Sequence, residues 1–330
     1  MPEALNLVYR SRRLQYPLLA AMNACEAWDR AGIELRSLKF VSGAAASDPM
    51  LIRGECDFIF GSHVSPYIHR FHGQPFVYLG QTVNWADDVL VSREPLVSAR
   101  DLEGKQLCDR NGLSPTDFGA NHAAGNHLLY LQREGVDLAK VTFVSGPHKK
   151  HYRNLLDGIG DAAFASPPYD GEARAAGLHL LPLAPLPMVN SSTMTTLSPT
   201  LRERPALCEA LLKATIMGIH FIKTQPEAFR KLIQTDVATE LEIDDQKVLD
   251  HLHRYSTSIM EPRLYPTADA IDNACRLAVI QEPAVAALNP MSLWDMHLLR
   301  GIEESEFIDD LYGGAVPGPG APPSRSSGGM

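Results

Sequence analysis

Two short stretches of this chain share one residue pattern, and each has the form of a buried strand that ends in serine. GECDFIFGS covers residues 54–62, and GIGDAAFAS covers residues 158–166. In each, an acidic turn precedes a run of apolar residues, and helical patterns lie on either side. Strands that alternate with helices indicate a mostly parallel sheet covered by helices. The repeat therefore predicts two α/β halves of related architecture.

The rest of the chain extends this plan. LNLVY, residues 5–9, has the pattern of a first strand, and residues 16–30 have helical spacing. With 330 residues, 45% hydrophobic and 21% charged, the chain has material for roughly two domains. Residues 180–198 suit a segment that crosses between the halves, and helical patterns follow to Tyr312. The Gly/Pro/Ser-rich residues 313–330 are predicted to be a disordered tail.

Composition excludes several classes of function. The net charge of -9 comes without a basic stripe, which argues against nucleic acid as a partner. The five cysteines are odd in number and form no CxxC pair, which argues against a disulfide framework and a zinc site. GxGxxG and P-loop motifs are absent, so no cofactor is predicted. No run approaches the ~20 apolar residues of a membrane span, and the first residues lack a signal-peptide pattern, so a cytoplasmic location is predicted.

Five stretches in order carry a family resemblance: AGIEL, RGECDFIFGS, GQPFVYLGQ, SARDLEGKQLCD and NPMSLWDMHLLRGIEESEFIDDLY. Together they resemble the nitrate/sulfonate/taurine and thiamine-precursor (NMT1/THI5-like) substrate-binding family. The resemblance implies a type 2 periplasmic-binding-protein fold, with two α/β lobes, each a mixed and mostly parallel sheet flanked by helices, and a ligand cleft between them. Lobe one would be residues 1–84 plus 190–312, and the inserted lobe two would be residues 85–189.

Several residues of lobe one are candidate ligand contacts. In such a fold Arg12 and Arg13 follow the first strand at a position that faces the cleft, where an arginine fork clamps a carboxylate or sulfonate. A solvated pair at a helix start explains them equally well. Two other pairs, Ser42–Gly43 and Ser62–His63, each follow a predicted strand and precede a helix. At such positions they could bind an anion or simply cap the helix. The further candidates in this lobe are Ser42, Gly43, Ser62 and, at the crossover, Asn84.

Histidines raise the question of catalysis. His63 follows the strand predicted in residues 54–62, and imidazole exchanges protons near neutral pH. Its alternative is a structural histidine held by hydrogen bonds. His69 and His72 have the i, i+3 spacing of a metal pair, but no third ligand stands at suitable spacing, so no metal is predicted.

Lobe two would meet the ligand from the opposite side. The resemblance places the turn NGLSPTDFG there, with Asp117 a helix cap as its alternative role. Tyr169 follows the strand predicted in residues 158–166 and has a ring that could stack on an aromatic ligand. The candidates in this lobe are Ser114, Thr116, Asp117, Ser166 and Tyr169.

Two functions remain open. The fold has cytoplasmic enzyme relatives, including a dihydroxyphthalate decarboxylase and a biphenyl sulfinate desulfinase. The desulfinase uses a cysteine just after the first strand, where this chain reads SRR, so that route is rejected. The favoured hypothesis is a cytoplasmic lyase of decarboxylase type that acts on a small, aromatic carboxylate, with His63 as acid and base. The alternative is a non-catalytic substrate-binding protein that delivers a small organic anion to the permease of an ABC transporter.

Overall fold

The protein divides into two compact units. The structure, a computed structural model, describes residues 2–109 and 122–323. Unit 1 consists of Met1–Trp85, Pro187–Asp244 and Ser256–Ala321, and unit 2 of Ala86–Leu186, Asp245–Tyr255 and Pro322–Met330. Residues 245–255, which the sequence assigns to lobe one, thus group with unit 2.

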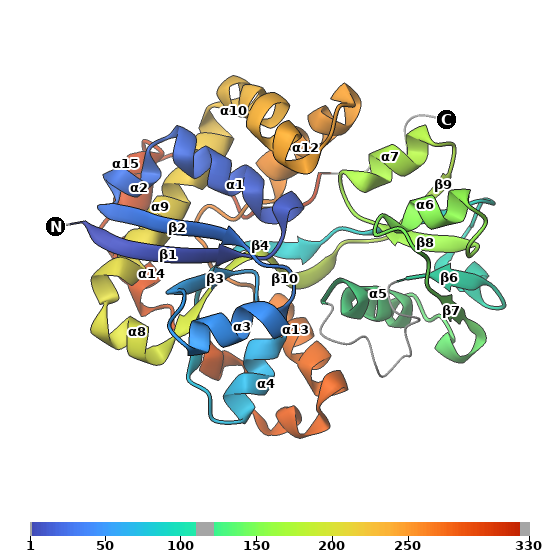
Figure 1. The fold of residues 1–330 in the computed structure, drawn as a ribbon, viewed down its shortest axis with the longest axis horizontal. Helices are drawn as coiled ribbons and strands as arrows, with labels where there is room; N and C mark the ends of the chain where they lie inside the picture. Colours follow the sequence, from blue (N-terminus) through green and yellow to red (C-terminus); the bar gives the residue numbers. More distant parts are fainter. Residues whose placement is uncertain (1, 110–121, 324–330) are drawn as a thin grey trace. The chain divides into compact units, whose positions relative to one another are not determined.

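Unit 1 is built on a five-stranded mixed sheet (Figure 1). β1 pairs in parallel with β2 and β3, and β10 runs antiparallel to β3. The carboxyl ends of β1, β2 and β3 therefore meet at one edge of the sheet, which is the edge where α/β proteins usually hold ligands. In order across the sheet the strands are β2 (Ile33–Phe40), β1 (Glu3–Tyr9), β3 (Phe58–Phe60), β10 (Leu186–Leu197) and β4 (Phe76–Ala86).

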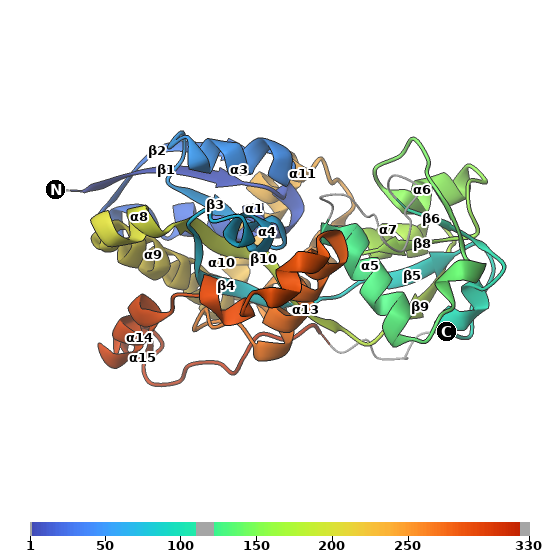
Figure 2. The ribbon, with the colours of Figure 1, turned by 90° about the horizontal axis from the view of Figure 1, so that it is seen from below.

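Helices cover both faces of this sheet. α1 (Arg12–Ala24) and α2 (Ala27–Arg30) lie with α9 (Pro205–Thr224) on one face, and α3 (Ala44–Ile52) and α4 (Ser65–Phe71) lie on the other (Figures 1 and 2). Their packing depends on glycine at one point. A Cβ at Gly218 of α9 would lie 2.4 Å from Cγ of Met22 in α1, so the two helices approach closely only because it is absent.

The helix α9 is the most apolar element of unit 1. By length and composition alone, this helix could cross a membrane. It is the one helix among the described residues that meets this criterion. Most of it is buried against α1, α2 and the sheet, as expected for a core helix. Its apolar length is therefore explained by the core of unit 1.

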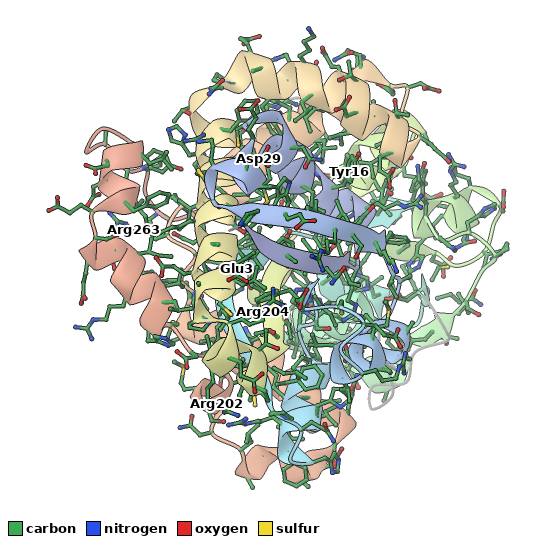
Figure 3. The ribbon with its side chains drawn as sticks, turned by 60° about the vertical axis from the view of Figure 1, so that its left-hand side comes forward. Glu3, Tyr16, Asp29, Arg202, Arg204 and Arg263 are labelled. Atoms are coloured by element: carbon green, nitrogen blue, oxygen red, sulfur yellow. The ribbon has the colours of Figure 1, made fainter. Side chains whose placement is uncertain are left out.

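The remaining helices of unit 1 follow α9 in the chain, apart from one short helix that directly precedes it. The π-helix η3 continues α10 without a break and leads into α11, and α14 and α15 pack against α9 (Figure 2). Arg204, at the start of α9, holds the first strand with a guanidinium 3.4 Å from the Glu3 carboxylate (Figure 3). The bounds are α8 (Ser198–Glu203), α10 (Pro226–Leu232), η3 (Ile233–Val237), α11 (Ala238–Leu241), α13 (Ala268–Gln281), η4 (Pro283–Ala287), η5 (Pro290–Leu293), α14 (His297–Glu304) and α15 (Phe307–Leu311).

Unit 2 repeats the plan with a second five-stranded mixed sheet. β6 pairs in parallel with β7 and β8, and β5 runs antiparallel to β8 and β9. Across the sheet the strands are β7 (Thr142–Val144), β6 (Gln106–Cys108), β8 (Ala162–Ala165), β5 (Val89–Ser92) and β9 (His179–Pro182). Its helices are η1 (Ala99–Leu102), α5 (His122–Arg133), η2 (Leu138–Lys140), α6 (His151–Leu156), α7 (Tyr169–Ala175) and most of α12 (Gln246–Ile259). The predicted α/β class with two mixed sheets flanked by helices is confirmed.

Gly320, near the end of the described residues, is anchored within unit 1. Gly320, in the stretch that the sequence assigns to a disordered tail, is buried. Its N–H donates to the Glu261 carboxylate at 3.3 Å, and its carbonyl accepts from the Trp85 indole at 2.9 Å. A Cβ at this position would lie 2.1 Å from the Ile259 carbonyl oxygen, so the contact requires glycine. The composition typical of disorder thus includes a residue with a specific packing role.

Candidate functional site

A polar cluster lies where β1 and β3 end in unit 1. Arg10 directly follows β1, and Ser62 follows β3 by two residues. The helices α3 and α4 begin near this edge and add a buried carboxylate and two further polar side chains. We call this group the strand-end cluster, and its members are Arg10, Asp48, Ser62, Ser65 and His69.

Asp48 is the acceptor at the centre of the cluster. Its side chain is 1% exposed. One carboxylate oxygen accepts from the Ser62 hydroxyl at 2.7 Å, and the other accepts from Ser65 at 2.6 Å and from Nε2 of His69 at 3.2 Å. Burial by itself raises the pKa of Asp48, but the hydrogen bonds from His69, Ser65 and Ser62 and the charge of Arg10 outweigh it. The pKa therefore lies below its ordinary value, and the carboxylate is ionised at neutral pH.

Arg10 supplies the positive charge of the cluster. Its Nη1 donates to the Gly61 carbonyl at 3.2 Å and to the Ser62 hydroxyl at 3.0 Å. Burial lowers its pKa, and the charge of Asp48 opposes that shift. The Nε atom is buried and has no hydrogen-bond partner in residues 2–109 or 122–323. A buried donor without an acceptor costs about 1–3 kcal/mol, so this nitrogen is a place where an oxygen of a ligand would be stabilised.

A network of neutral groups holds Arg10 in place. The Gln15 side chain accepts from the backbone N–H of Arg10 at 2.7 Å and donates to the Ser191 carbonyl at 2.8 Å. Gly61 makes room for this amide, because a Cβ there would lie 2.1 Å from Nε2 of Gln15. Its φ of +102° is also a conformation that glycine adopts readily. Glycine at the end of β3 is thus required by the side chain that orients the arginine.

His63, the residue that the sequence suggests for proton transfer, makes a hydrogen bond through one ring nitrogen. Its Nε2 lies 3.0 Å from the Ser191 carbonyl, so that nitrogen carries the proton and donates it. Its own carbonyl accepts from the Tyr78 hydroxyl at 3.0 Å. The ring is 6% exposed and links β10 to the start of α4. These contacts explain His63 as a buried residue that ties two elements together.

The other candidates of the first lobe have varied surroundings. Arg12 is half exposed and pairs with Glu240 at 3.0 Å, and Arg13 follows it in the first turn of α1. Ser42 and Gly43 are exposed between β2 and α3. The Asn84 amide is used within unit 1, because it donates to the Tyr265 carbonyl at 2.8 Å and accepts from the Thr267 N–H at 3.1 Å. Of these candidates and Ser62, only Ser62 is in the strand-end cluster.

Unit 2 holds the remaining candidates. Ser114, Thr116 and Asp117 lie outside the described residues. The Ser166 carbonyl accepts from the N–H of Tyr169 at 2.8 Å, and the ammonium of Lys150 lies 4.6 Å from the Tyr169 ring centroid. Both side chains are partly exposed, with Ser166 directly after β8 and Tyr169 at the start of α7.

A buried carboxylate in unit 2 had no counterpart in the sequence prediction. Asp109, 1% exposed, directly follows β6 and lies 2.5 Å from Nδ1 of His127 and 3.5 Å from Nδ1 of His151. The contacts join β6 to α5 and α6, and His127 stacks on Phe164 with ring centroids 4.1 Å apart. Among the described residues no group of three His, Cys, Asp or Glu side chains is arranged to hold a metal ion.

The sequence and the fold can be compared with known proteins. Residues 28–229, more than half of the chain, match the family described as NMT1/THI5 like. The chain belongs to the NMT1/THI5-like family. The resemblance drawn from the sequence is thereby confirmed. No curated protein matches the chain.

Solved structures share the fold at low sequence identity. The periplasmic aliphatic sulphonate binding protein SsuA of Escherichia coli is 16% identical, with a TM-score of 0.67 over 90% of this chain and 93% of its own. The alkanesulfonate-binding protein SsuA of Xanthomonas axonopodis, bound to MOPS, is 13% identical, with a TM-score of 0.62 over 89% and 99%. The desulfurization enzyme DszB is 16% identical, with a TM-score of 0.61 over 92% and 99%. The fold thus occurs in binding proteins and in at least one enzyme.

The hypothesis of a cytoplasmic lyase is wrong. The matched family and the sulfonate-binding neighbours point to the alternative, a non-catalytic substrate-binding protein. The acid and base role of His63 was assigned within that hypothesis, and in the structure its ring lies in hydrogen-bond contact with the Ser191 carbonyl. The cytoplasmic location stays a prediction.

Proposed function

We propose that this protein is a non-catalytic substrate-binding protein for a small organic anion, whose head group binds Arg10. The observation that carries the proposal is the buried Nε of Arg10, which has no acceptor in the described part of the chain. Guanidinium groups match the oxygens of carboxylates and sulfonates, and a hydrogen bond between two charged groups is stronger than a neutral one. The names of the SsuA neighbours support a sulfonate or a related anion.

The charges of the cluster suit reversible binding. Without ligand, Asp48 balances Arg10 through the bridging Ser62 hydroxyl, so the buried arginine is not left without a counter-charge. A ligand oxygen at Nε would add a partner without displacing either Nη1 bond. The partner that receives the anion would be the permease of an ABC transporter, as in the alternative drawn from the sequence.

Removing the charge of Arg10 tests this function. We expect Arg10→Met to weaken binding of butanesulfonate by about 10- to 100-fold, the equivalent of one charge-assisted hydrogen bond. The measurement is isothermal titration calorimetry on variants whose circular dichroism matches the parent. Arg36→Gln is the matched control, because Arg36 is an exposed arginine on β2 that pairs with Glu34 at 3.6 Å. Undiminished affinity in Arg10→Met, or no binding of any organic anion by the parent, would contradict the proposal.

A further inference from the structure

His69 is the histidine of the strand-end cluster. Its Nε2 lies 3.2 Å from the Asp48 carboxylate, and its ring stacks on Phe76 of β4 with centroids 4.7 Å apart. Asp48 is ionised and can only accept, so Nε2 carries a proton whether the ring is neutral or charged. The His69 side chain is 32% exposed, against 1% for Asp48. The ring can therefore exchange a second proton with water, although its partner is buried.

His69 and His72 are three residues apart in the sequence but bind different carboxylates. The His72 side chain is 57% exposed, and its Nε2 lies 2.9 Å from the Glu282 carboxylate, where α13 ends. His69 turns instead toward α3, which carries Asp48. The spacing that suggests a metal pair thus separates a histidine of the cluster from one that has its own partner at the surface.

A chain of three hydrogen bonds joins His69 to Arg10. Asp48 accepts from Nε2 of His69 at one carboxylate oxygen and from the Ser62 hydroxyl, at 2.7 Å, at the other. The same hydroxyl accepts from Nη1 of Arg10 at 3.0 Å. Asp48 is therefore the acid that lies between two basic side chains, and it can balance the charge of only one of them.

Other titratable groups packed around this carboxylate and α4 stay neutral near neutral pH. Burial raises the pKa of the Cys56 thiol, before β3, to about 12. Burial also raises the pKa of Tyr78 on β4 well above its ordinary value, and that of Tyr67 on α4. Asp272 of α13 adds a charge on the side of Tyr67, whereas Glu282 is paired with His72. His69 is thus the member of the strand-end cluster whose charge can respond to pH in the physiological range.

We propose that the charge of His69 regulates the anion site, which binds its ligand tightly when the ring is protonated and more weakly when the ring is neutral. The proposal rests on the function proposed above and adds its control by pH. With a neutral ring, the charges of Arg10 and Asp48 cancel. With a protonated ring, the three side chains carry one net positive charge, which a bound anion neutralises. Affinity is therefore highest at low pH and falls as pH rises and His69 loses its proton.

Titration calorimetry with butanesulfonate near pH 5 and near pH 8 tests this control. The sulfonate stays ionised over this range, and so does Asp48. We expect the parent to bind about 3- to 10-fold more tightly near pH 5, the effect of one added charge beyond direct contact with the ligand. His69→Gln keeps an N–H donor for Asp48 and cannot titrate, so its affinity should be equal at both pH values. His72→Gln is the matched control and should keep the pH dependence of the parent.

Proton uptake gives a second measurement, which needs no variant. If a proton on His69 strengthens anion binding, the anion must by reciprocity strengthen proton binding to His69. Binding of butanesulfonate near pH 6.5 should therefore take up a fraction of a proton. Titrations in two buffers with different enthalpies of ionisation measure this fraction. It should be unchanged in His72→Gln and absent in His69→Gln.

The possible results separate this control from the function on which it rests. Equal affinity of the parent at both pH values, without proton uptake, would overturn the control by His69 and leave the anion site standing. A pH dependence that persists in His69→Gln would also overturn it, because another group, such as the nearby His63, would then be the one that titrates. Failure of the parent to bind any organic anion at either pH would instead overturn the proposed function.

Discussion

Replacing Gly61 with alanine is expected to destabilise unit 1 by about 3–5 kcal/mol. The new Cβ would lie 2.1 Å from Nε2 of Gln15 and 3.3 Å from the Ser191 carbonyl oxygen, at a φ of +102°. Gln15 is 1% exposed and cannot swing into solvent. Its displacement would break its bonds to the Arg10 N–H and to the Ser191 carbonyl, in addition to the backbone strain.

Tryptophan fluorescence during urea unfolding measures this effect in unit 1 alone. The three tryptophans, Trp28, Trp85 and Trp294, all belong to that unit. Gly73→Ala is the matched control, because Gly73 has a φ of +81° and nothing within 4 Å of its missing Cβ. It should cost only the backbone strain of about 1–2 kcal/mol. Equal losses at the two positions would show that the contact with Gln15 contributes nothing.

The fold was readable from the sequence because its signals are local. The two stretches with the shared residue pattern, residues 54–62 and 158–166, contain β3 and β8. Each of these is the central strand of its own sheet. Apolar runs between glycine-rich turns determine such strands without help from distant residues. The family followed from the order of several such stretches, and the match over residues 28–229 confirms it.

The strand-end cluster was not readable in the same way. Arg10, Arg12 and Arg13 lie within four residues of one another, and little in the sequence distinguishes Arg10, which enters the cluster, from Arg12, which points to Glu240. That choice depends on where β1 ends and α1 begins, after the capping Ser11. The one available clue was that Arg10 directly follows the strand. Asp48 was missed because its donors come from α4 and from the end of β3, so only the tertiary structure brings them together.

The choice of a lyase as the favoured hypothesis has a similar origin. A histidine at a strand end suggested proton transfer, since imidazole titrates near neutral pH. The partner of its Nε2, the Ser191 carbonyl, is 128 residues away in the sequence. Ser191 has a φ of +59°, a conformation that the residue pattern of β10 does not indicate. Knowing which element faces a histidine is therefore necessary before assigning it a chemical role.

Asp48→Asn is expected to destabilise unit 1 by about 3 kcal/mol at neutral pH. The substitution keeps the shape of the side chain and removes its charge. Arg10 would lose the negative charge that balances it, and the new NH₂ would face the Nε2 donor of His69 in place of the oxygen that accepts from it. Asp29→Asn is the control, because Asp29 is an exposed aspartate of α2 in the same unit (Figure 3).

The pH dependence separates the charge of Asp48 from its shape. Because the pKa of Asp48 is lower in the folded protein than in the unfolded chain, its ionisation stabilises the fold above the unfolded pKa, and this is lost as pH falls through the folded value. The gap in unfolding free energy between parent and Asp48→Asn should therefore shrink below about pH 4. Urea unfolding followed by tryptophan fluorescence, near pH 7 and near pH 3, measures both gaps. A gap of the same size at both pH values would mean that the ionised carboxylate does not stabilise the cluster, and that Arg10 is held by its neutral hydrogen bonds alone.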